Sequence, residues 1–230
     1  MFDDVTIRAS DRQASQRFYE TVLRPLGVGM SASDDYVVNW NDFSLVQATD
    51  ADPPTRRLHI AFVAPTREHV DAFWRIGTGA GYQSDGEPGP RPQYRDDYYG
   101  SFLLDPDGNS AEAVNHGAMR TGGIIDHLWI RVGGLDASKA FYEAVGRDAG
   151  FRLLSFGGEP HRAQFGAGNG SFSVVDDGPP AQQVRIAFRR ADAGAKEFRD
   201  PDGNRVDLIA ADLSPAHTRC PPAAAPRAGP

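Results

Sequence analysis

The sequence predicts an α+β fold made of tandem modules, in each of which a strand and a helix precede further strands. Two levels of internal repeat and one recurring turn predict it, and repeats come first because a missed repeat misassigns the whole fold. The second half of the chain is a shortened copy of the first. The recurring segments are Ile7-Arg8 with Ile130-Arg131, Phe18-Tyr19-Glu20 with Phe141-Tyr142-Glu143, and Asp105-Pro-Asp-Gly-Asn109 with Asp200-Pro-Asp-Gly-Asn204.

The first half of the chain is itself doubled. When Asp4 is aligned with His59, the aromatic residues of the segments that follow also align, Phe18 with Phe73 among them. Each unit therefore begins with a short apolar run and continues with a polar segment that can form a helix. The strand-like runs are residues 5–9 and 59–64, and the helical segments are residues 11–23 and 66–80.

Both helical segments carry a start signal and one apolar face. Ser10 or Asp11 before the first, and Thr66 before the second, can accept hydrogen bonds from the free backbone amides of a helix N-terminus. Apolar residues then recur at spacings of three and four, which predicts that one face of each helix is buried.

Further strands follow each helix. Residues 36–40 and 43–48 are separated by Asn41-Asp42, which suits a two-residue hairpin turn. Residues 98–104 and 110–114 flank an Asp-Pro-Asp-Gly-Asn turn, in which proline presets φ and glycine or asparagine accepts a positive φ. The strand, helix, strands unit thus appears twice before residue 117 and again, reduced, after residue 124.

Two domains and a tail are predicted. A chain of 230 residues fits one large domain or two small ones, and the repeat favours two. The stretch 117–123 holds three glycines and little that can pack, so we expect domains over residues 1–117 and 124–212. The Pro- and Ala-rich residues 213–230 are predicted to be a disordered tail.

Composition argues against several classes of function. The chain has 31 Asp plus Glu against 24 Lys plus Arg, a net charge of -7, which disfavours nucleic acid and anionic membranes as partners. No apolar stretch reaches the roughly 18 residues of a membrane-spanning helix, and no secretory signal is visible. The single cysteine, Cys220, allows no disulfide framework. We therefore expect a cytoplasmic protein.

Several motifs together resemble those of one known superfamily. They are His59-Ile-Ala-Phe62, the loop from Gly86 to Tyr94, Tyr98-Tyr99-Gly100, and Asp105-Pro-Asp-Gly-Asn109 with Glu112. This set resembles the vicinal oxygen chelate superfamily of glyoxalase I, extradiol dioxygenases, fosfomycin-resistance transferases and bleomycin-binding proteins. The resemblance covers most of residues 3–117 and, more weakly, residues 124–210. It implies paired βαβββ modules forming half-open, curled mixed sheets around a metal or ligand site.

The resemblance also implies where a metal would lie. Family ligands come from the first strand of each module and the last strand of the second, which correspond to Asp4, His59 and Glu112 here. Because Asp4 and His59 occupy equivalent positions, a local two-fold axis would bring them face to face. Oxygen and imidazole ligands suit a divalent first-row metal, Fe, Mn, Ni or Zn, with positions left open for substrate. The alternative is that Asp4 pairs with an arginine and His59 is a satisfied core histidine.

The remaining equivalent positions are poor in ligands. Ser44 lies at the position of Glu112 in the first module, and the second half has His127, Arg185 and Asp207. A guanidinium cannot ligate a metal, so a second metal site is disfavoured. From Arg185 to Asp207 the second half also lacks the helix and tyrosine-rich loop of the first, so we expect it to play a structural role beside the first domain.

The loop before the last hairpin supplies candidate pocket residues. Arg91 can clamp an anion, and Tyr94 and Tyr99 can stack on a ring or donate to an oxyanion. Together with Glu112 these are the candidate catalytic residues, although ordinary loop packing explains the tyrosines equally well. Tyr98 is less favoured because a strand alternates its faces, and His116 is a reserve ligand.

Three functions remain open from the sequence. The first is a metal-dependent enzyme of the vicinal oxygen chelate type, a lyase, isomerase or dioxygenase acting on a small molecule with adjacent oxygen donors. The second is a metal-free binding or resistance protein for an antibiotic or metabolite. The third is a metal-free enzyme that uses Asp4 or Glu112 as general base. Because tandem domains imitate the pairing of single-domain relatives, we expect a monomer or a weak homodimer.

Overall fold

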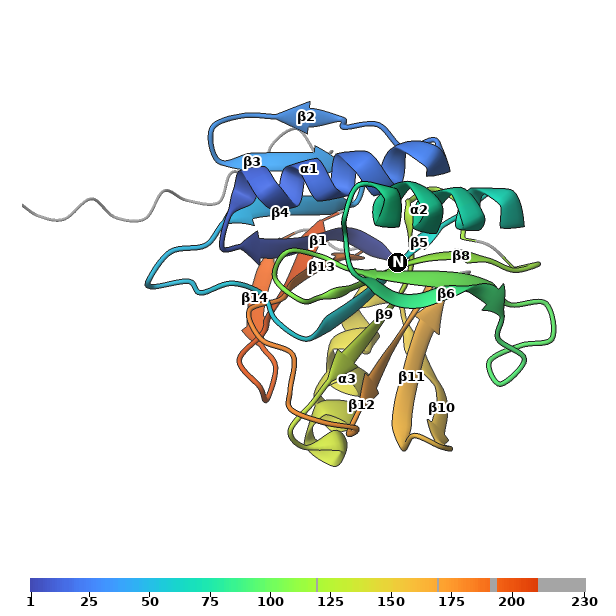
Figure 1. Ribbon diagram of the computed structural model, residues 1–230. Helices are drawn as coiled ribbons and strands as arrows, with labels where there is room; N and C mark the ends of the chain where they lie inside the picture. The colour runs from blue at the N-terminus through green and yellow to red at the C-terminus, as the bar shows by residue number, and fades with distance from the viewer. Residues whose placement is uncertain (119, 169, 191–193, 211–230) are drawn as a thin grey trace, which may run out of the picture.

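The computed structural model describes residues 1–118, 120–168, 170–190 and 194–210 (Figure 1). The predicted tail, residues 213–230, lies outside the described residues. The described chain forms two mixed, unclosed sheets flanked by helices, so the predicted α+β class is confirmed. No described helix is long and apolar enough to span a bilayer.

Four successive modules make up these sheets, and each begins with a strand. The first two follow the predicted order of strand, helix and three strands, and the third repeats it. They contain β1 (Phe2–Ala9), α1 (Arg12–Leu23), a 3-10 turn η1 (Arg24–Leu26), β2 (Ala32–Ser33), β3 (Val37–Trp40) and β4 (Phe43–Gln47); β5 (Leu58–Val63), α2 (Arg67–Gly79), β6 (Ser84–Pro90), β7 (Tyr99–Leu104) and β8 (Ser110–Asn115); and β9 (Ile125–Arg131), α3 (Leu135–Ala149), β10 (Arg152–Gly157), β11 (Arg162–Ala167) and β12 (Gly170–Val175).

The fourth module is the reduced one. It contains only β13 (Arg185–Arg190), β14 (Lys196–Arg199) and β15 (Arg205–Ala210), with no helix among the described residues between β13 and β14. The predicted shortening of the second half is therefore seen in its last module, while the third module is complete.

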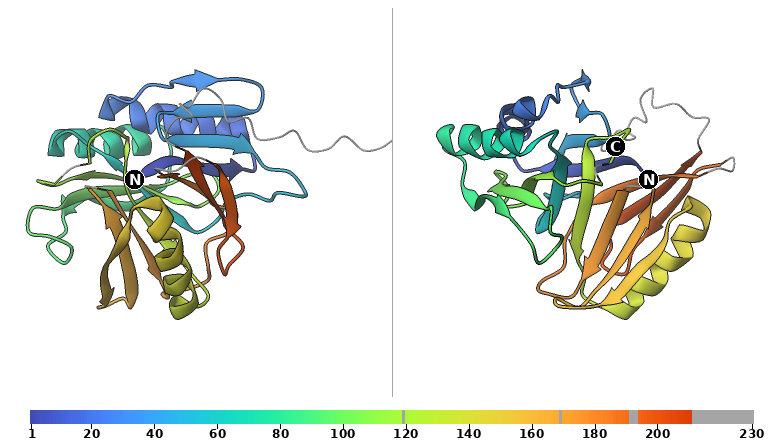
Figure 2. Two further views of the ribbon diagram at one scale, coloured as in Figure 1. Left: turned by 180° about the vertical axis from the view of Figure 1, so that it is seen from behind. Right: turned by 90° about the vertical axis from the view of Figure 1, so that its right-hand side faces the viewer.

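Each sheet combines strands from both halves of the chain. The seven-stranded sheet has the order β14-β15-β13-β1-β4-β3-β2, and the eight-stranded sheet has the order β10-β11-β12-β9-β5-β8-β7-β6. The first module thus pairs with the fourth through β1 and β13, and the second with the third through β5 and β9, both antiparallel. Figures 1 and 2 show α1 and α2 together on one side and α3 on the other. The domains 1–117 and 124–212 stay a prediction, since neither half forms a sheet of its own.

The repeated Asp-Pro-Asp-Gly-Asn turns tie helices to strands in the same way twice. In the second module, Asp105 accepts backbone hydrogen bonds from Asp107 and Asn109 on one oxygen, and the Tyr19 hydroxyl of α1 donates to the other at 3.0 Å. In the fourth, Asp200 accepts from Tyr142 of α3 at 3.1 Å. Satisfying buried carboxylates in this way lets the turns lie in the core.

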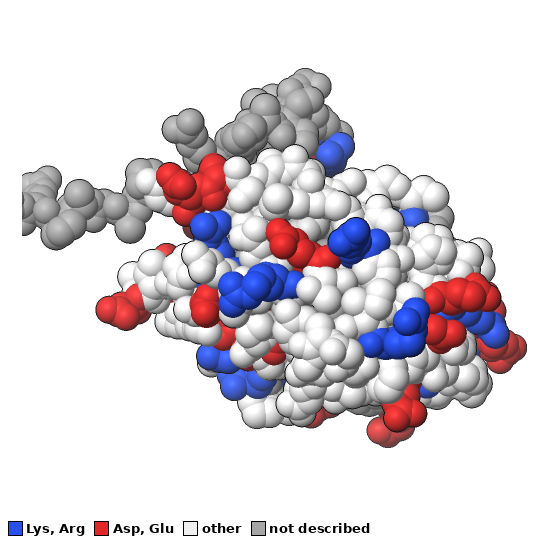
Figure 3. Space-filling view, turned by 45° about the horizontal axis from the view of Figure 1, so that its top comes forward, with Lys and Arg blue, Asp and Glu red and all other residues white. Residues whose placement is uncertain are grey.

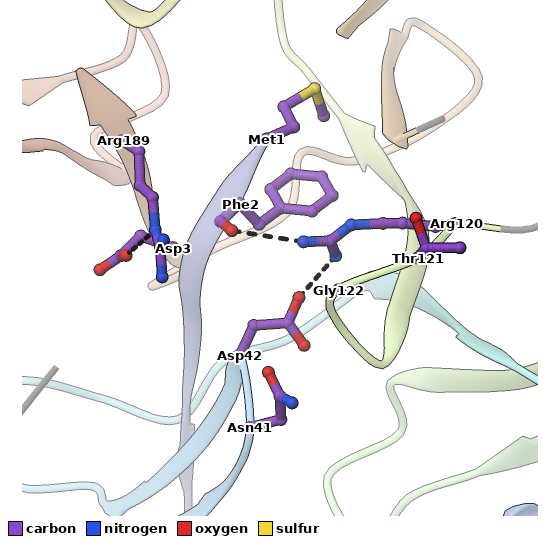
Figure 4. A pocket seen from close by; sticks show the side chains of 9 residues that line it. All are labelled: Met1, Phe2, Asp3, Asn41, Asp42, Arg120, Thr121, Gly122 and Arg189. Carbon is purple, nitrogen blue, oxygen red and sulfur yellow. Dashed lines mark hydrogen bonds and ion pairs between the residues drawn. The ribbon is translucent and has the colours of Figure 1, made fainter. Parts of the chain in front are cut away.

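Arg120 anchors the segment that the sequence predicts as the domain boundary. Arg120 is buried and donates to the Asp42 carboxylate at 2.5 Å and to the Ile125 carbonyl at 2.6 Å. Asp42 also accepts from the Ile124 amide at 2.8 Å. A pocket of about 160 Å³ lies beside this ion pair, as Figure 4 shows, with Arg189 and Asp3 on its other side. The expectation that residues 117–123 hold little that packs is therefore wrong, because Arg120 binds the Phe2 carbonyl of β1 and Asp42 in the turn before β4.

Candidate metal centre

Three side chains from the second and third modules converge in the eight-stranded sheet. His59 lies on β5, Glu112 on β8 and His127 on β9, and one ligand atom of each falls within 4.8 Å of the others. The Nε2 atom of His59 lies 2.9 Å from Oε2 of Glu112, and Nε2 of His127 lies 3.6 Å from the same oxygen. Glu112 is 1% exposed and the two imidazoles 14% and 17%, so the site is open to solvent through its histidines.

Strand register explains why these residues meet. Ala61 on β5 pairs with Glu112 on β8 and with His127 on β9. Directly paired residues point to the same face of a sheet, and so do residues two apart on one strand, so His59 shares this face. Ala61 lies between them and is buried in a small apolar cluster with Tyr98 and Val114. The opposite face packs against the core, where Ile60, Phe62 and Leu128 are buried.

A hydrogen-bond chain orients His59. Its Nδ1 lies 3.1 Å from the Ser110 hydroxyl, which donates its own proton to Asp85 at 2.7 Å. Because the hydroxyl proton is used on Asp85, the hydroxyl oxygen accepts from Nδ1–H of His59. This places the proton on Nδ1 and leaves the Nε2 lone pair directed at Glu112.

A carboxylate orients His127 in the same way. Asp126 accepts from Nδ1 of His127 at 2.9 Å and contacts Nε2 of His116 at 3.3 Å. Burial acts to raise the pKa of Asp126, but the hydrogen bonds from His116 and His127 outweigh it and hold that pKa well below its usual value. Burial likewise acts to lower the pKa of His127, and its hydrogen bond to Asp126 and the charge of Glu112 raise it overall.

Glu112 is fixed by a tyrosine. The Tyr98 hydroxyl donates to Oε1 of Glu112 at 2.7 Å, so Oε2 is the oxygen presented to the two histidines. Burial, followed by the charge of Glu112, raises the pKa of Tyr98 far above its usual value, so the phenol keeps its proton. Gly100 on β7 is required here, since a Cβ at this position would lie 2.5 Å from Oε1 of Glu112.

These residues fit a divalent metal. With both Nδ1 atoms donating, two Nε2 lone pairs and one carboxylate oxygen face each other, and such a set of acceptors needs a cation or a proton between them. Two imidazoles and one carboxylate with open positions form the ligand set typical of first-row metals. The chain could therefore hold one metal ion through His59, Glu112 and His127.

The structure does not bring Asp4 to His59, and this corrects the expected ligand set. Asp4 lies on β1 in the other sheet, where it accepts from Arg185 at 3.2 Å and from the hydroxyls of Thr6 and Ser44. The reason is module pairing, because β5 lies beside β9 and not beside β1. His127, not Asp4, is the third residue of the cluster. Asp4 instead pairs with an arginine, as the alternative interpretation of the sequence has it.

In the seven-stranded sheet, the positions equivalent to those of the candidate metal centre are occupied by Asp4, Arg185 and Asp207, which form an ion-pair cluster. Arg185 donates from Nε to Asp207 at 2.7 Å as well as to Asp4. Burial raises the pKa of Asp4, although its hydrogen bonds to Ser44 and Thr6 and the charge of Arg185 act in the opposite direction. The guanidinium thus lies where a second metal would need to bind.

The loop residues are placed differently from one another. Tyr99 points away from the cluster, and its hydroxyl donates to Asp71 on α2 at 2.8 Å. Tyr94 is half exposed, with its ring 5.2 Å from that of Tyr98. Arg91 lies over the Phe102 ring at 5.4 Å, and that ring is 5.8 Å from the His59 ring. His116 reaches the site through Asp126.

Sequence reasoning missed the roles of His127, Tyr98 and Asp126. The repeat predicts that modules pair within each half, which places His127 with Arg185 and Asp207. The adjacent pair Asp126-His127 was a usable signal, since a carboxylate beside a metal-binding histidine is a common orienting arrangement. Tyr98 precedes β7, which begins at Tyr99, so strand alternation did not apply to it.

Comparison with known proteins agrees with this fold. Residues 2–113 match the model of the Glyoxalase/Bleomycin resistance protein/Dioxygenase superfamily. Glyoxalase I from Zea mays is 18% identical, with a TM-score of 0.60 over 91% of this chain and 92% of that one. A putative dioxygenase from Bacillus subtilis is 14% identical, with a TM-score of 0.60 over 91% of this chain and 84% of that one.

A glyoxalase/bleomycin resistance protein from Albidiferax ferrireducens is 28% identical over 50% of this chain and 98% of its own, with a TM-score of 0.46. None of the curated proteins compared with the chain matches it. The family match over residues 2–113 confirms the predicted resemblance to the glyoxalase/bleomycin resistance protein/dioxygenase superfamily, also called the vicinal oxygen chelate superfamily. The fold of glyoxalase I is shared over 91% of the chain.

Proposed function

We propose that the protein is a divalent-metal-dependent enzyme of the vicinal oxygen chelate type, acting on a small molecule with two adjacent oxygen donors. The observation that carries the proposal is the convergence of two imidazole nitrogens and one carboxylate oxygen within 4.8 Å on one sheet face. The separate orientation of each donor, by Ser110, Asp126 and Tyr98, supports it.

A metal bound there would act as a Lewis acid on an enolate, catecholate or similar oxyanion. The chain's own residues hold the donors in place for it. Tyr98 keeps Oε1 of Glu112 occupied, so this carboxylate presents Oε2 alone. Ser110 and Asp126 keep the protons of His59 and His127 on Nδ1. Three ligands leave coordination positions open, as substrate chelation requires.

The donor set narrows the choice of metal. Two imidazoles and one carboxylate are typical of Fe(II), and also suit Mn, Ni and Zn, whereas Mg and Ca prefer oxygen ligands alone. Glu112, Arg91 and Tyr94 are the proposed catalytic or pocket residues, with Tyr98 as a positioning residue. A cytoplasmic location and a monomer or weak homodimer stay predictions.

Metal content tests the proposal. Protein purified without chelators, and then reloaded in turn with Fe, Mn, Ni and Zn, is expected to hold one ion per chain by elemental analysis. The Glu112→Gln and His127→Gln variants are expected to lose that ion. The matched control is His161→Gln, because His161 is exposed and outside the cluster. Wild-type protein that cannot be loaded with any of these metals would sink the proposal.

A metal-free acid/base enzyme is the second candidate. The 2.9 Å contact between His59 and Glu112 favours it, because a proton between these atoms would also satisfy the cluster. Activity that persists in wild-type protein stripped by a chelator, and is lost in Glu112→Gln, would select this candidate.

A further inference from the structure

An arginine of the third module lies on the same sheet face as the candidate metal centre. The guanidinium carbon of Arg162, on β11, lies 5.1 Å from the centre of the Trp129 ring. Trp129 on β9 pairs directly with His59 on β5, and it is two residues from His127. The Trp129 ring therefore shares the sheet face of the cluster, and Arg162 lies against it.

Arg162 makes no ion pair or hydrogen bond through its side chain among the described residues, and its contact is with the Trp129 ring. Register places Arg131 on the same face, since both arginines align with Val175 of β12. Arg131, however, is neutralised by Asp177 at 2.9 Å. A partly buried guanidinium without a carboxylate partner, on the same sheet face as a proposed metal ion, is unusual because like charges repel.

A second such arginine lies on the other side of the centre. Arg91 lies over Phe102, which pairs with Glu112 across β7 and β8. Its guanidinium donates to the carbonyl oxygens of Glu87 and Pro90 and meets no carboxylate among the described residues. The nearby carboxylates are already engaged, Glu112 by Tyr98 and His59, and Asp85 by Ser110.

From this placement we infer that the substrate carries, apart from its two adjacent oxygens, a separate anionic group that binds Arg162. The inference rests on the proposed function. The contact with the Trp129 ring holds the guanidinium in place, and no described side chain or carbonyl oxygen takes up its N–H groups. These N–H groups can bind a carboxylate or phosphate in bidentate fashion. Arg91 contributes less, since two of its donors already bind carbonyl oxygens.

Hydroxamates test this, because they chelate metals through two adjacent oxygens. Protein loaded with Co(II) is titrated with hydroxamates that end in a carboxylate, a phosphonate or a neutral carboxamide, on chains of increasing length, and the visible spectrum reports binding. Wild type is expected to prefer one anionic end group over the carboxamide by roughly tenfold or more. Which anion is preferred separates a carboxylate from a phosphate substrate.

Variants of three arginines test which residue causes the preference for an anionic end group. Arg162→Gln is expected to abolish it while leaving carboxamide binding unchanged, Arg91→Gln to weaken it, and the control Arg131→Gln to leave it intact. If the wild-type protein does not bind Co(II), both the proposed function and the inference are wrong. If Co(II) and the carboxamide bind in a way that depends on Glu112, but no anionic end group is preferred at any chain length, only the inference is wrong. A preference that survives Arg162→Gln also overturns it.

Discussion

Arg185 on β13 donates to Asp4 on β1 at 3.2 Å, and this ion pair joins the first and last modules of the chain. The same guanidinium donates to Asp207 on β15 at 2.7 Å. A fixed cation thus pairs with the partly buried Asp4 and the buried Asp207, which lie at positions equivalent by repeat to those of the candidate metal centre. The Arg185 guanidinium cannot be a metal ligand, and it occupies the place between Asp4 and Asp207 where a second ion would bind. We therefore expect one metal ion per chain.

Replacing Arg185 tests the importance of that ion pair for stability. Arg185→Met leaves the partly buried Asp4 without its cation and Asp207 with Arg205 alone, so the free energy of unfolding is expected to fall by about 3 kcal/mol. The control is Arg189→Met, whose mostly exposed side chain pairs with Asp3 and whose loss should cost at most about 1 kcal/mol. Urea unfolding measures both, and equal losses would show that burial of the pair has no special effect.

Tyr98 and Tyr99 form a matched pair for the metal site. Tyr98→Phe removes the hydrogen bond to Glu112 while keeping the ring, so metal affinity is expected to fall by about 10- to 100-fold with little loss of stability. Tyr99→Phe removes only the bond to Asp71 on α2 and should leave metal affinity unchanged. Competition with a chelating dye measures the dissociation constants. A larger effect from Tyr99 would contradict the placement of the two hydroxyls.

The two turn-anchoring tyrosines are expected to behave alike. Tyr19→Phe and Tyr142→Phe each leave one oxygen of a buried carboxylate, Asp105 or Asp200, with one fewer donor. Each change should lower the free energy of unfolding by about 1–3 kcal/mol. The two residues share no partner, so the double variant should lose the sum within about 0.5 kcal/mol. Urea unfolding of all three variants checks this, and a neutral single variant would refute it.

Metal is expected to stabilise the folded chain. At a free concentration of about 100 times the dissociation constant, binding to the folded state adds about 2.7 kcal/mol to the free energy of unfolding. Thermal unfolding with metal and with a chelator measures this difference. His127→Gln should unfold identically in both conditions, and a shift that persists in this variant would mean that the metal binds elsewhere.

Local structure could be predicted closely from the sequence. The helices expected at residues 11–23 and 66–80 are Arg12–Leu23 and Arg67–Gly79, because cap residues and the spacing of apolar residues act over a few residues only. Asp11 does cap α1, accepting from the Ala14 amide at 3.0 Å. The resemblance pairs His59 with Glu112, and the structure has them on neighbouring strands of one module.

The pairing of modules could not be predicted in the same way. A repeat makes β1 an equally plausible neighbour for β5, β9 or β13, since all four first strands have similar patterns. The choice depends on contacts between distant residues, such as Phe2 against Phe172 and Phe188. Because β1 pairs with β13 and β5 pairs with β9, Asp4 and His59 lie in different sheets, and His127 lies close to His59 instead.

The order of the two sheets has a consequence for synthesis on the ribosome. The sheet that holds the histidines is complete once β12 has emerged, because all its strands lie between β5 and β12. β1 is made first, yet its neighbour β13 starts only at Arg185. Through most of translation β1 can pair with β4 alone and exposes an open edge, which is a template for aggregation. A nascent chain that stalls before Arg185 would therefore keep this edge of β1 exposed.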